Sequence, residues 1–230
     1  MKSPFNPRWW SCVFLVGLLS ACAGPGNVPF NQLVNFSEGP ANSQPAPLYS
    51  SPKDIAASLQ KGGYIIYMRH GRTRYDQLEL ERNNRIAGKF DINQCETQRQ
   101  LSDEGRAELK FSGSNFRATA FPIEKSFSSQ YCRAKESAAF FVDGATAVLD
   151  LSGEGEFGTN PAIKGRVQAF LAQRPAPGKN IFMMAHGGIF WLATGWVIQE
   201  GHAVVLDPSN PQVIVARIGP QEWGAVGQAR

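Results

Sequence analysis

The sequence predicts an α/β protein whose sheet is mostly parallel and is covered by helices on both faces. Apolar runs rich in β-branched or aromatic residues at 64–69 and 180–185, and a shorter run ending at Ser129, are typical of buried strands. Strands that alternate with helices favour parallel pairing, because each helix carries the chain back to the same end of the sheet. All three runs end on polar residues, where open α/β sheets bind ligands.

Length and composition are those of a globular protein. The chain has 230 residues, of which 43% are hydrophobic and 18% charged, enough for one sizeable domain with extensions. The formal net charge of +4 is too small to indicate nucleic-acid binding or a polybasic membrane patch. We therefore expect no nucleic-acid partner.

Residues 1–21 have the pattern of an export signal. Lys2 and Arg8 precede an apolar stretch at 12–21, which is too short to span a bilayer at about 1.5 Å per residue. The following Leu19-Ser20-Ala21-Cys22 resembles the bacterial lipobox, which implies that Cys22 carries acyl chains and anchors a lipoprotein. Ala23, in place of Asp, indicates the outer membrane, with the domain facing the periplasm. The alternative is an ordinary secretory peptide with a chance cysteine.

Residues 22–50 are expected to form a disordered tether. The segment 23–50 contains five Pro and three Gly and has no period of 2 or 3.6 residues. A coil of this length reaches about 30 Å, which would hold a domain clear of the lipid head groups. The folded domain is then 51–230.

Capping signals mark the first helices of that domain. Ser51 is a suitable N-cap, and Pro52 follows it at the first helical position. Ser102 is a second N-cap candidate, followed by two acids that complement a helix dipole. The polar stretch 72–100 is long for a loop and is expected to hold one short helix. The expected helices are 52 to about 62, 76–84, 102 to about 118, 131–142, 161–173 and 187 to about 194.

The strands follow from apolar runs between these helices. The Gly-rich segment 143–158 is expected to be mostly loop, and the chain closes on two strands after its last helix. The expected strands are 64–69, one ending at Ser129, 146–150, 180–185, 202–206 and 213–218.

The three strand ends carry matching chemistry. Arg69 and His70 follow the first run, Ser129 and Arg133 the second, and His186 the third. The carboxyl ends of parallel strands meet at one edge of a sheet, so we expect these side chains to lie together. Guanidinium forks and imidazoles suit a phosphoryl group, because phosphoryl transfer needs a nucleophile in line and cations around the equatorial oxygens.

The chain resembles the histidine phosphatase superfamily, which has the phosphoglycerate-mutase-like, three-layer α/β/α fold. The matching residues are Arg69-His70-Gly71-Arg72-Thr73, Leu101-Ser102-x-x-Gly105, Ser129-x-x-x-Arg133-Ala134-x-x-Ser137-Ala138 and Ala185-His186-Gly187-Gly188. They occur in the family's order and span 64–190. The stretch Cys95-x-Thr97-Gln98-Arg99-x-Leu101-Ser102-x-x-Gly105-Arg106 is similar to a bacterial subgroup with few assigned substrates.

The resemblance implies catalytic roles for four residues. His70 would attack phosphorus as a neutral imidazole and form a phosphohistidine, with Arg69, Arg133 and His186 around the phosphoryl group. No metal and no cofactor are implied. Thr73 and Arg74, which follow the first motif, are further candidates for phosphate binding, and Arg72 or Arg99 of the same polar loop could also touch substrate.

The family's general acid has no obvious counterpart. Glu154 is our candidate, in a Gly-rich segment where mutase-like members carry theirs, and Asp150, Glu156 and Glu200 remain alternatives. Asp76 stands where many members carry Asn near the phosphate; an acid there would repel phosphate, so Asp76 points away or the loop is built differently.

Cys95 and Cys132 are expected to form a disulfide. The other two of the four cysteines fall in the signal peptide and at the lipidation site, and an exported chain meets an oxidising compartment. Cys132 directly precedes Arg133, so the bridge would pin the arginine-rich loop over the pocket.

Two functions follow from these features. The first is an exported, lipid-anchored phosphohydrolase acting on a phosphomonoester of a small molecule or a glycan. The second is a lipid-tethered binding module that keeps the phosphate pocket and hydrolyses poorly, which the missing acid makes credible. Glycolytic mutase activity is discounted, because its substrates are cytoplasmic.

Overall fold

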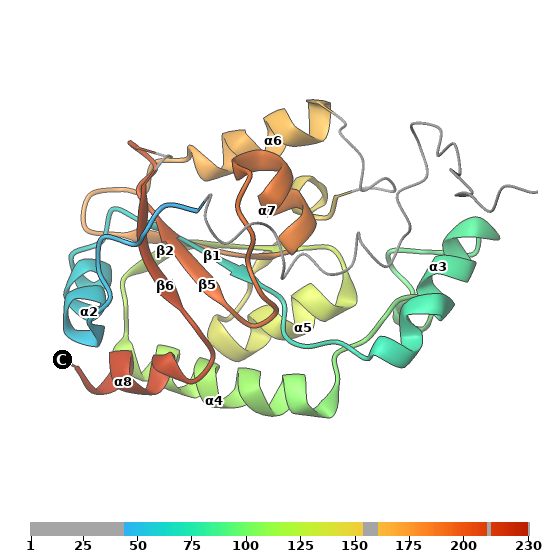
Figure 1. The fold of residues 1–230 in the computed structure, drawn as a ribbon, viewed down its shortest axis with the longest axis horizontal. Helices are drawn as coiled ribbons and strands as arrows, with labels where there is room; N and C mark the ends of the chain where they lie inside the picture. Colours follow the sequence, from blue (N-terminus) through green and yellow to red (C-terminus); the bar gives the residue numbers. More distant parts are fainter. Residues whose placement is uncertain (1–43, 154–160, 211–212, 230) are drawn as a thin grey trace, which may run out of the picture.

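The computed structural model describes residues 44–153, 161–210 and 213–229. These form a six-stranded sheet in the order β3-β2-β4-β1-β5-β6, with helices on both faces (Figure 1). The strands are β1 (Ile65–Arg69), β2 (Ile123–Ser129), β3 (Thr146–Val148), β4 (Asn180–Ala185), β5 (Ala203–Leu206) and β6 (Ile214–Ile218). The helices are α2 (Pro52–Lys61), α3 (Leu78–Ile86), α4 (Asp103–Thr119), α5 (Cys132–Phe141), α6 (Pro161–Leu171), α7 (Gly187–Thr194) and α8 (Glu222–Gln228).

The sheet is mostly parallel, as the sequence predicts. Strands β3, β2, β4 and β1 pair in parallel, whereas β5 runs antiparallel to β1 and β6 antiparallel to β5. Every residue of the central strand β4 is buried, which is typical of a parallel strand covered on both faces.

Alternate residues of β1 serve two separate cores. Ile66 and Met68 pack in the cluster shared with α2, α4, α5 and α8, and Ile65 and Tyr67 pack in the cluster shared with α6 and α7. This alternation follows from the two-residue period of a strand. Figure 1 shows α6 and α7 on one face of the sheet and α2, α4, α5 and α8 on the other. The α/β class and its three layers are confirmed.

The capping predictions are confirmed at both helices. The Ser51 hydroxyl accepts a hydrogen bond from the Asp54 amide at 3.1 Å, and the Ser102 hydroxyl accepts one from the Gly105 amide at 3.0 Å. The predicted helices and strands all occur with small shifts at their ends. Strand β3 ends two residues early, at Val148, and continues as a 3₁₀ turn.

Two features of the ends of the domain differ from the prediction. Helix α8 was not expected, because Gly224 within it lowers helix propensity; the fold stabilises α8 by burying Trp223, whose ring lies 5.3 Å from that of Phe116. The segment assigned to the tether also reaches the sheet. The amides of Leu48 and Tyr49 donate to β6 carbonyls, each at 2.9 Å.

Several predicted features lie outside the described residues: the export signal, Cys22, Glu154 and Glu156. Within the described ranges, no helix combines the length and the apolar character needed to cross a membrane.

Candidate active site

The carboxyl ends of three adjacent strands bring the site together. Arg69 of β1 lies opposite Ala185 of β4, so that His70 and His186 follow at the same edge of the sheet. Strand β2 pairs with the other side of β4 and ends at Ser129. The rings of His70 and His186 are 5.1 Å apart, centroid to centroid. The predicted convergence of strand ends is what the structure shows.

His70 is held as a neutral imidazole whose lone-pair nitrogen faces a cation. Its Nδ1 lies 2.9 Å from the Gly71 carbonyl, which can only accept, so the proton sits on Nδ1 and Nε2 carries the lone pair. That lone pair accepts from Nε of Arg133 at 3.3 Å. Burial, followed by the charge of Arg133, lowers the pKa of His70 well below its ordinary 6.5.

Ser137 couples the two segments that meet at His70. Its hydroxyl donates to the Arg133 carbonyl at 2.6 Å and accepts from the Gly71 amide at 3.1 Å. Gly71 has no room for a side chain, since a Cβ there would lie 2.5 Å from the Leu109 side chain. The backbone that orients His70 is therefore tied to the helix that carries Arg133.

Three arginines gather at the site: Arg99 and Arg133 are buried, and Arg69 is mostly buried. Arg69 donates through Nη1 to the Ile198 carbonyl at 3.0 Å and through Nη2 to Glu200 at 3.2 Å, while its buried Nε has no partner among the described residues. The Arg133 guanidinium lies over the Tyr131 ring, 4.4 Å from its centroid. Arg99, only 8% exposed, has a buried Nη1 for which the described part of the chain supplies no partner. Burial, with Arg133 next, lowers the pKa of Arg99 to about 10, so it remains charged.

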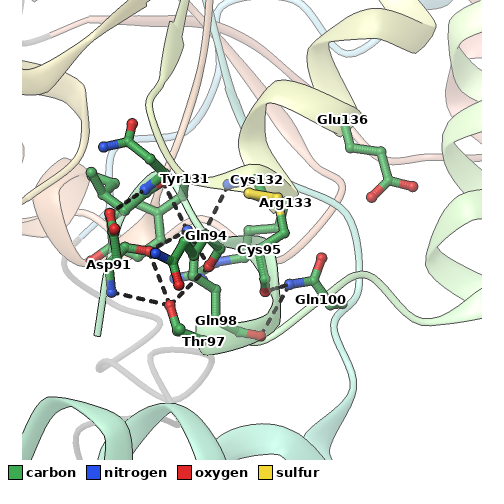
Figure 2. Close-up of a disulfide and its surroundings, with 12 residues drawn as sticks. Asp91, Gln94, Cys95, Thr97, Gln98, Gln100, Tyr131, Cys132, Arg133 and Glu136 are labelled. Atoms are coloured by element: carbon green, nitrogen blue, oxygen red, sulfur yellow. Dashed lines mark hydrogen bonds between the residues drawn. A yellow bond between two sulfur atoms is a disulfide. The ribbon is translucent and has the colours of Figure 1, made fainter. Parts of the chain in front are cut away.

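A disulfide fastens the loop that carries Arg99. Cys95 is bonded to Cys132 at the start of α5, with Cα atoms 5.6 Å apart, as predicted (Figure 2). Beside it, the Gln98 carboxamide oxygen accepts from the Cys132 amide at 3.0 Å, and its nitrogen donates to the Ile92 carbonyl at 2.9 Å. The loop is thus joined to α5 through Gln98 and Cys132, which directly precede Arg99 and Arg133 in the chain.

Two glutamates hold the arginines in place. Glu81 of α3 accepts from Arg133 at 3.0 Å and from the Arg99 amide at 2.7 Å. Burial acts to raise the pKa of Glu81, but the charge of Arg133 and the Arg99 amide outweigh it and hold that pKa below its ordinary value. Glu200 accepts from Arg69 and from the hydroxyl and amide of Thr73, at 3.0 to 3.2 Å. Both carboxylates therefore act as acceptors.

His186 ends a chain of hydroxyl contacts. Its Nε2 lies 2.8 Å from the Ser129 hydroxyl, which lies 3.2 Å from the Ser152 hydroxyl. Its carbonyl accepts from the Tyr67 hydroxyl at 2.8 Å, which fixes the backbone at the start of α7. Burial, followed by the charges of Arg133 and Arg69, lowers the pKa of His186 well below 6.5.

The described site carries excess positive charge with both histidines neutral. Four arginines and two glutamates make up its charged groups: Arg69, Arg85, Arg99, Arg133, Glu81 and Glu200. Two of the guanidinium groups also have a buried nitrogen that no described residue satisfies, which is costly unless a ligand does so. Both features suit a dianion such as a phosphoryl group. No cluster of three or more His, Cys, Asp or Glu side chains suited to a metal occurs among the described residues.

Several solved structures have a similar fold. A protein titled TTHB049 from Thermus thermophilus is 18% identical, with a TM-score of 0.44, over 68% of this chain and 99% of that one. The protein histidine phosphatase SixA complexed with tungstate is 16% identical, with a TM-score of 0.45, over 69% and 97%. The phosphoglycerate mutase from Thermus thermophilus is 18% identical, with a TM-score of 0.45, over 67% and 97%. No family model matches the sequence, and no curated protein matches it.

The structure brings together most of the predicted site residues. His70, Arg69, Arg133, His186 and Thr73 converge, with Thr73 binding Glu200 through its hydroxyl. The structure does not bring Arg74 to them.

Arg74 and its neighbours point outward. Arg74 is half-exposed and pairs with the exposed Asp76 at 2.6 Å, so Asp76 points away from the site, one of the two outcomes expected for it. Arg72 pairs with Glu108 at 3.2 Å and is also exposed. The alternation of a strand-like backbone explains this, because Thr73 between them is buried.

Sequence reasoning missed Glu81 as a site residue. Its neighbourhood reads as a short, solvated helix in a polar stretch, and the local signal is the four-residue spacing to Arg85, with which Glu81 also pairs at 3.1 Å. Glu200 was considered only as an acid, whereas the structure uses it to hold Arg69 and Thr73.

Proposed function

We propose that this chain is a phosphohydrolase of the histidine phosphatase superfamily, which cleaves a phosphomonoester through a phosphohistidine on His70. The observation that carries the proposal is the contact between His70 and Arg133: a lone pair on Nε2, fixed by the Gly71 carbonyl, meets a buried guanidinium at 3.3 Å. A neutral nucleophile beside a cation is the arrangement that attack on a phosphoryl group requires.

The residues divide the work of the first step between attack and charge stabilisation. A phosphoryl oxygen would take Nε–H of Arg133 away from His70, which frees the Nε2 lone pair for phosphorus. As the P–N bond forms, the P–O bond to the alcohol breaks and the alcohol oxygen leaves with a proton from solvent; water then hydrolyses the phosphohistidine to phosphate and free His70. The unpartnered nitrogens of Arg69 and Arg99 would donate to the remaining oxygens. Glu81 and Glu200 keep the three guanidinium groups oriented, so little reorganisation is needed as charge shifts in the transition state.

A cavity beside the site supports a sizeable leaving group. It has a volume of about 610 Å³ and shares Tyr131 and Arg85 with the site. Its other lining residues include the Phe90 ring and the polar side chains of Asp91 and Gln94. Aromatic faces and hydrogen-bonding groups of this kind suit a small polar molecule or a sugar of a glycan as the alcohol portion of the substrate.

Turnover of an aryl phosphate by purified variants tests the proposal. His70→Ala should reduce kcat by more than about a hundredfold, since loss of a nucleophile costs several kcal/mol of barrier at about 1.4 kcal/mol per tenfold. His202→Gln is the matched control, because the His202 ring contacts the Glu200 carbonyl at 3.1 Å through Nδ1 and its backbone bonds stay in the variant, so turnover should stay within a few-fold of wild type. A protein that binds phosphate and fails to turn over any phosphomonoester would instead be the tethered binding module.

We further propose that the protein is a lipoprotein of the bacterial envelope, anchored through Cys22 and facing the periplasm. The lipobox-like quartet supports this proposal, and the Cys95–Cys132 disulfide suits an oxidising compartment. Labelled fatty acid should enter the wild-type protein and not Cys22→Ser. Equal labelling of the two proteins would contradict the anchor.

A further inference from the structure

We infer that Ser152, acting through Ser129, fixes the proton of neutral His186 on Nε2, so that the site takes up one proton on His186 Nδ1 when it binds a dianion. The inference rests on the proposed function only in taking the ligand to be a phosphoryl-like dianion. Ser152 would be a positioning residue, since it touches His186 only through Ser129.

Ser152 sets the direction of the hydrogen bonds that run from it through Ser129 to His186. The Ser152 hydroxyl lies 3.1 Å from the Val148 carbonyl, and a carbonyl can only accept, so the Ser152 proton is used there. The contact of 3.2 Å between the two hydroxyls then requires Ser129 to donate to Ser152. Ser129 has one proton, so it cannot also donate to His186.

The remaining contacts are consistent with this direction. Ser152 also accepts from the Gln130 amide at 2.8 Å, and Ser129 also accepts from the Tyr131 amide at 3.2 Å. The contact of 2.8 Å between Ser129 and His186 Nε2 is therefore a bond in which His186 donates. Each hydroxyl donates once and accepts twice, so both are saturated. Nδ1 of the neutral ring is left with a lone pair.

A lone pair is the wrong group to place beside a dianion. The charged groups around His186 in the free protein are mainly cations, which together with burial hold its pKa well below 6.5, so the ring is neutral at pH 7. These groups come from four parts of the fold: Arg69 at the end of β1 with His70 directly after it, Arg85 and Glu81 of α3, Arg99 of the disulfide loop, and Arg133 of α5. A bound dianion offsets the cations and raises the pKa of His186. Protonation of Nδ1 then turns the repulsive lone pair into a donor.

Histidine tautomers can be read directly by ¹⁵N NMR. The chain has three His, so labelled imidazoles give few signals, which His70→Ala and His186→Gln assign. We expect His70 as the Nδ1–H tautomer and His186 as the Nε2–H tautomer in the free wild-type protein at pH 7.5. In Ser152→Ala, Ser129 is free to donate to Nε2, so His186 should move toward the Nδ1–H tautomer. An Nδ1–H tautomer of His186 in wild type would overturn the inference.

Proton uptake supplies the second readout. Tungstate is a suitable probe, because it is tetrahedral and stays a dianion at neutral pH. Calorimetric titration in two buffers of different ionisation enthalpy should show that wild type takes up close to one proton. In the pH range where uptake is complete, tungstate affinity should fall about tenfold for each unit by which the pH is raised. Uptake should persist in His70→Ala and disappear in His186→Gln. Ser152→Ala should take up clearly less than one proton.

Ser112→Ala is the matched control, because the Ser112 hydroxyl is also buried and lies within hydrogen-bonding distance of two carbonyls, those of Glu108 and Pro220. It should take up the same proton as wild type. No uptake by wild type, no binding of tungstate, or equal uptake by Ser152→Ala and wild type would each contradict the inference. Both readouts work without turnover, so a protein that shows them and forms no phosphohistidine would refute the proposed hydrolase alone.

Discussion

The Nε–H of Arg133 donates to Nε2 of His70 across 3.3 Å, although 63 residues separate the two in the chain. Separate elements deliver them: His70 follows β1, and Arg133 lies in the first turn of α5. A guanidinium near the positive end of a helix is unfavourable by itself, so its position needs a compensating contact. Glu81 supplies that contact, and its removal gives the first prediction.

Glu81→Gln should impair both stability and turnover. Loss of its charge leaves buried Arg133 without a counter-ion, which typically costs about 3 kcal/mol or more of unfolding free energy. A displaced Arg133 should also lower kcat/KM about a hundredfold. Glu79→Gln on the same helix is the control, since Glu79 is exposed and its ion pair at 3.6 Å is with Arg82, which is exposed too. Denaturant unfolding and aryl phosphate kinetics measure both effects, and equal behaviour of the two variants would contradict the role of Glu81.

Gly105→Ala should destabilise the domain and disturb the segment after His70. A Cβ on Gly105 would collide with the backbone oxygen of Arg72, and a backbone atom cannot move aside as a side chain can. Such overpacking typically costs about 1 to 3 kcal/mol. Gly165→Ala in α6 is the matched control: nothing lies within 4 Å of a Cβ there, and alanine should stabilise the helix by about 0.5 to 1 kcal/mol. A neutral Gly105→Ala would show that the backbone contact is not tight.

Reduction of the Cys95–Cys132 disulfide should weaken both the fold and ligand binding. The bridge closes a loop of 37 residues, for which the chain-entropy model gives about 3 to 4 kcal/mol. Cys95 is exposed, so reductant can reach the bond in the folded protein. We expect a lower Tm and a higher KM, because the loop carries Arg99. The Cys95→Ser, Cys132→Ser double variant should have the Tm and KM of reduced wild type, and neither value should change on adding reductant. Wild-type Tm and KM that do not respond to reductant would refute the role of the bridge.

Stability should fall as the pH drops below about 6.5. Burial and nearby arginines lower the pKa of both His70 and His186 in the folded protein, so the unfolded chain binds more protons below 6.5. The stability that comes from burying the two histidines in their neutral form is fully present above pH 6.5. It is lost as the pH falls from 6.5 toward their pKa values in the folded protein. The slope should approach about 2.7 kcal/mol per pH unit, or 1.36 for each histidine. Urea unfolding at pH 7.5, 6.5 and 5.5 measures it; His186→Gln should halve the slope, and a flat profile in wild type would contradict the account.

The sequence predicts the residues at the strand ends of this site better than the carboxylate that holds the arginines in place. His70, Arg69 and His186 were predictable because each ends or follows a short apolar run, and the carboxyl ends of parallel strands must meet. Glu81 was not, because α3 buries none of its residues and shows no apolar stripe; its glutamate turns inward only because Arg133 and Arg99 arrive there from elsewhere in the chain.

Two other features could not be predicted from the sequence, for related reasons. The contact of Ser152 with Ser129 joins residues 23 apart, and no pattern in a Gly-rich segment indicates it. Helix α8 forms through tertiary burial of Trp223 against local propensity. Arg74 was a candidate by proximity to the motif, and the alternation of buried and exposed residues turns it outward.

Chemical trapping of the intermediate tests the central claim most directly. The wild-type protein should be mixed with a ³²P-labelled phosphomonoester, quenched in alkali within one turnover, and digested for mass spectrometry. We predict one phosphoryl group on His70, stable in alkali and lost in acid, absent from His70→Ala and retained in His202→Gln. Turnover of the substrate with no label on His70, or with label on another residue, would contradict the account.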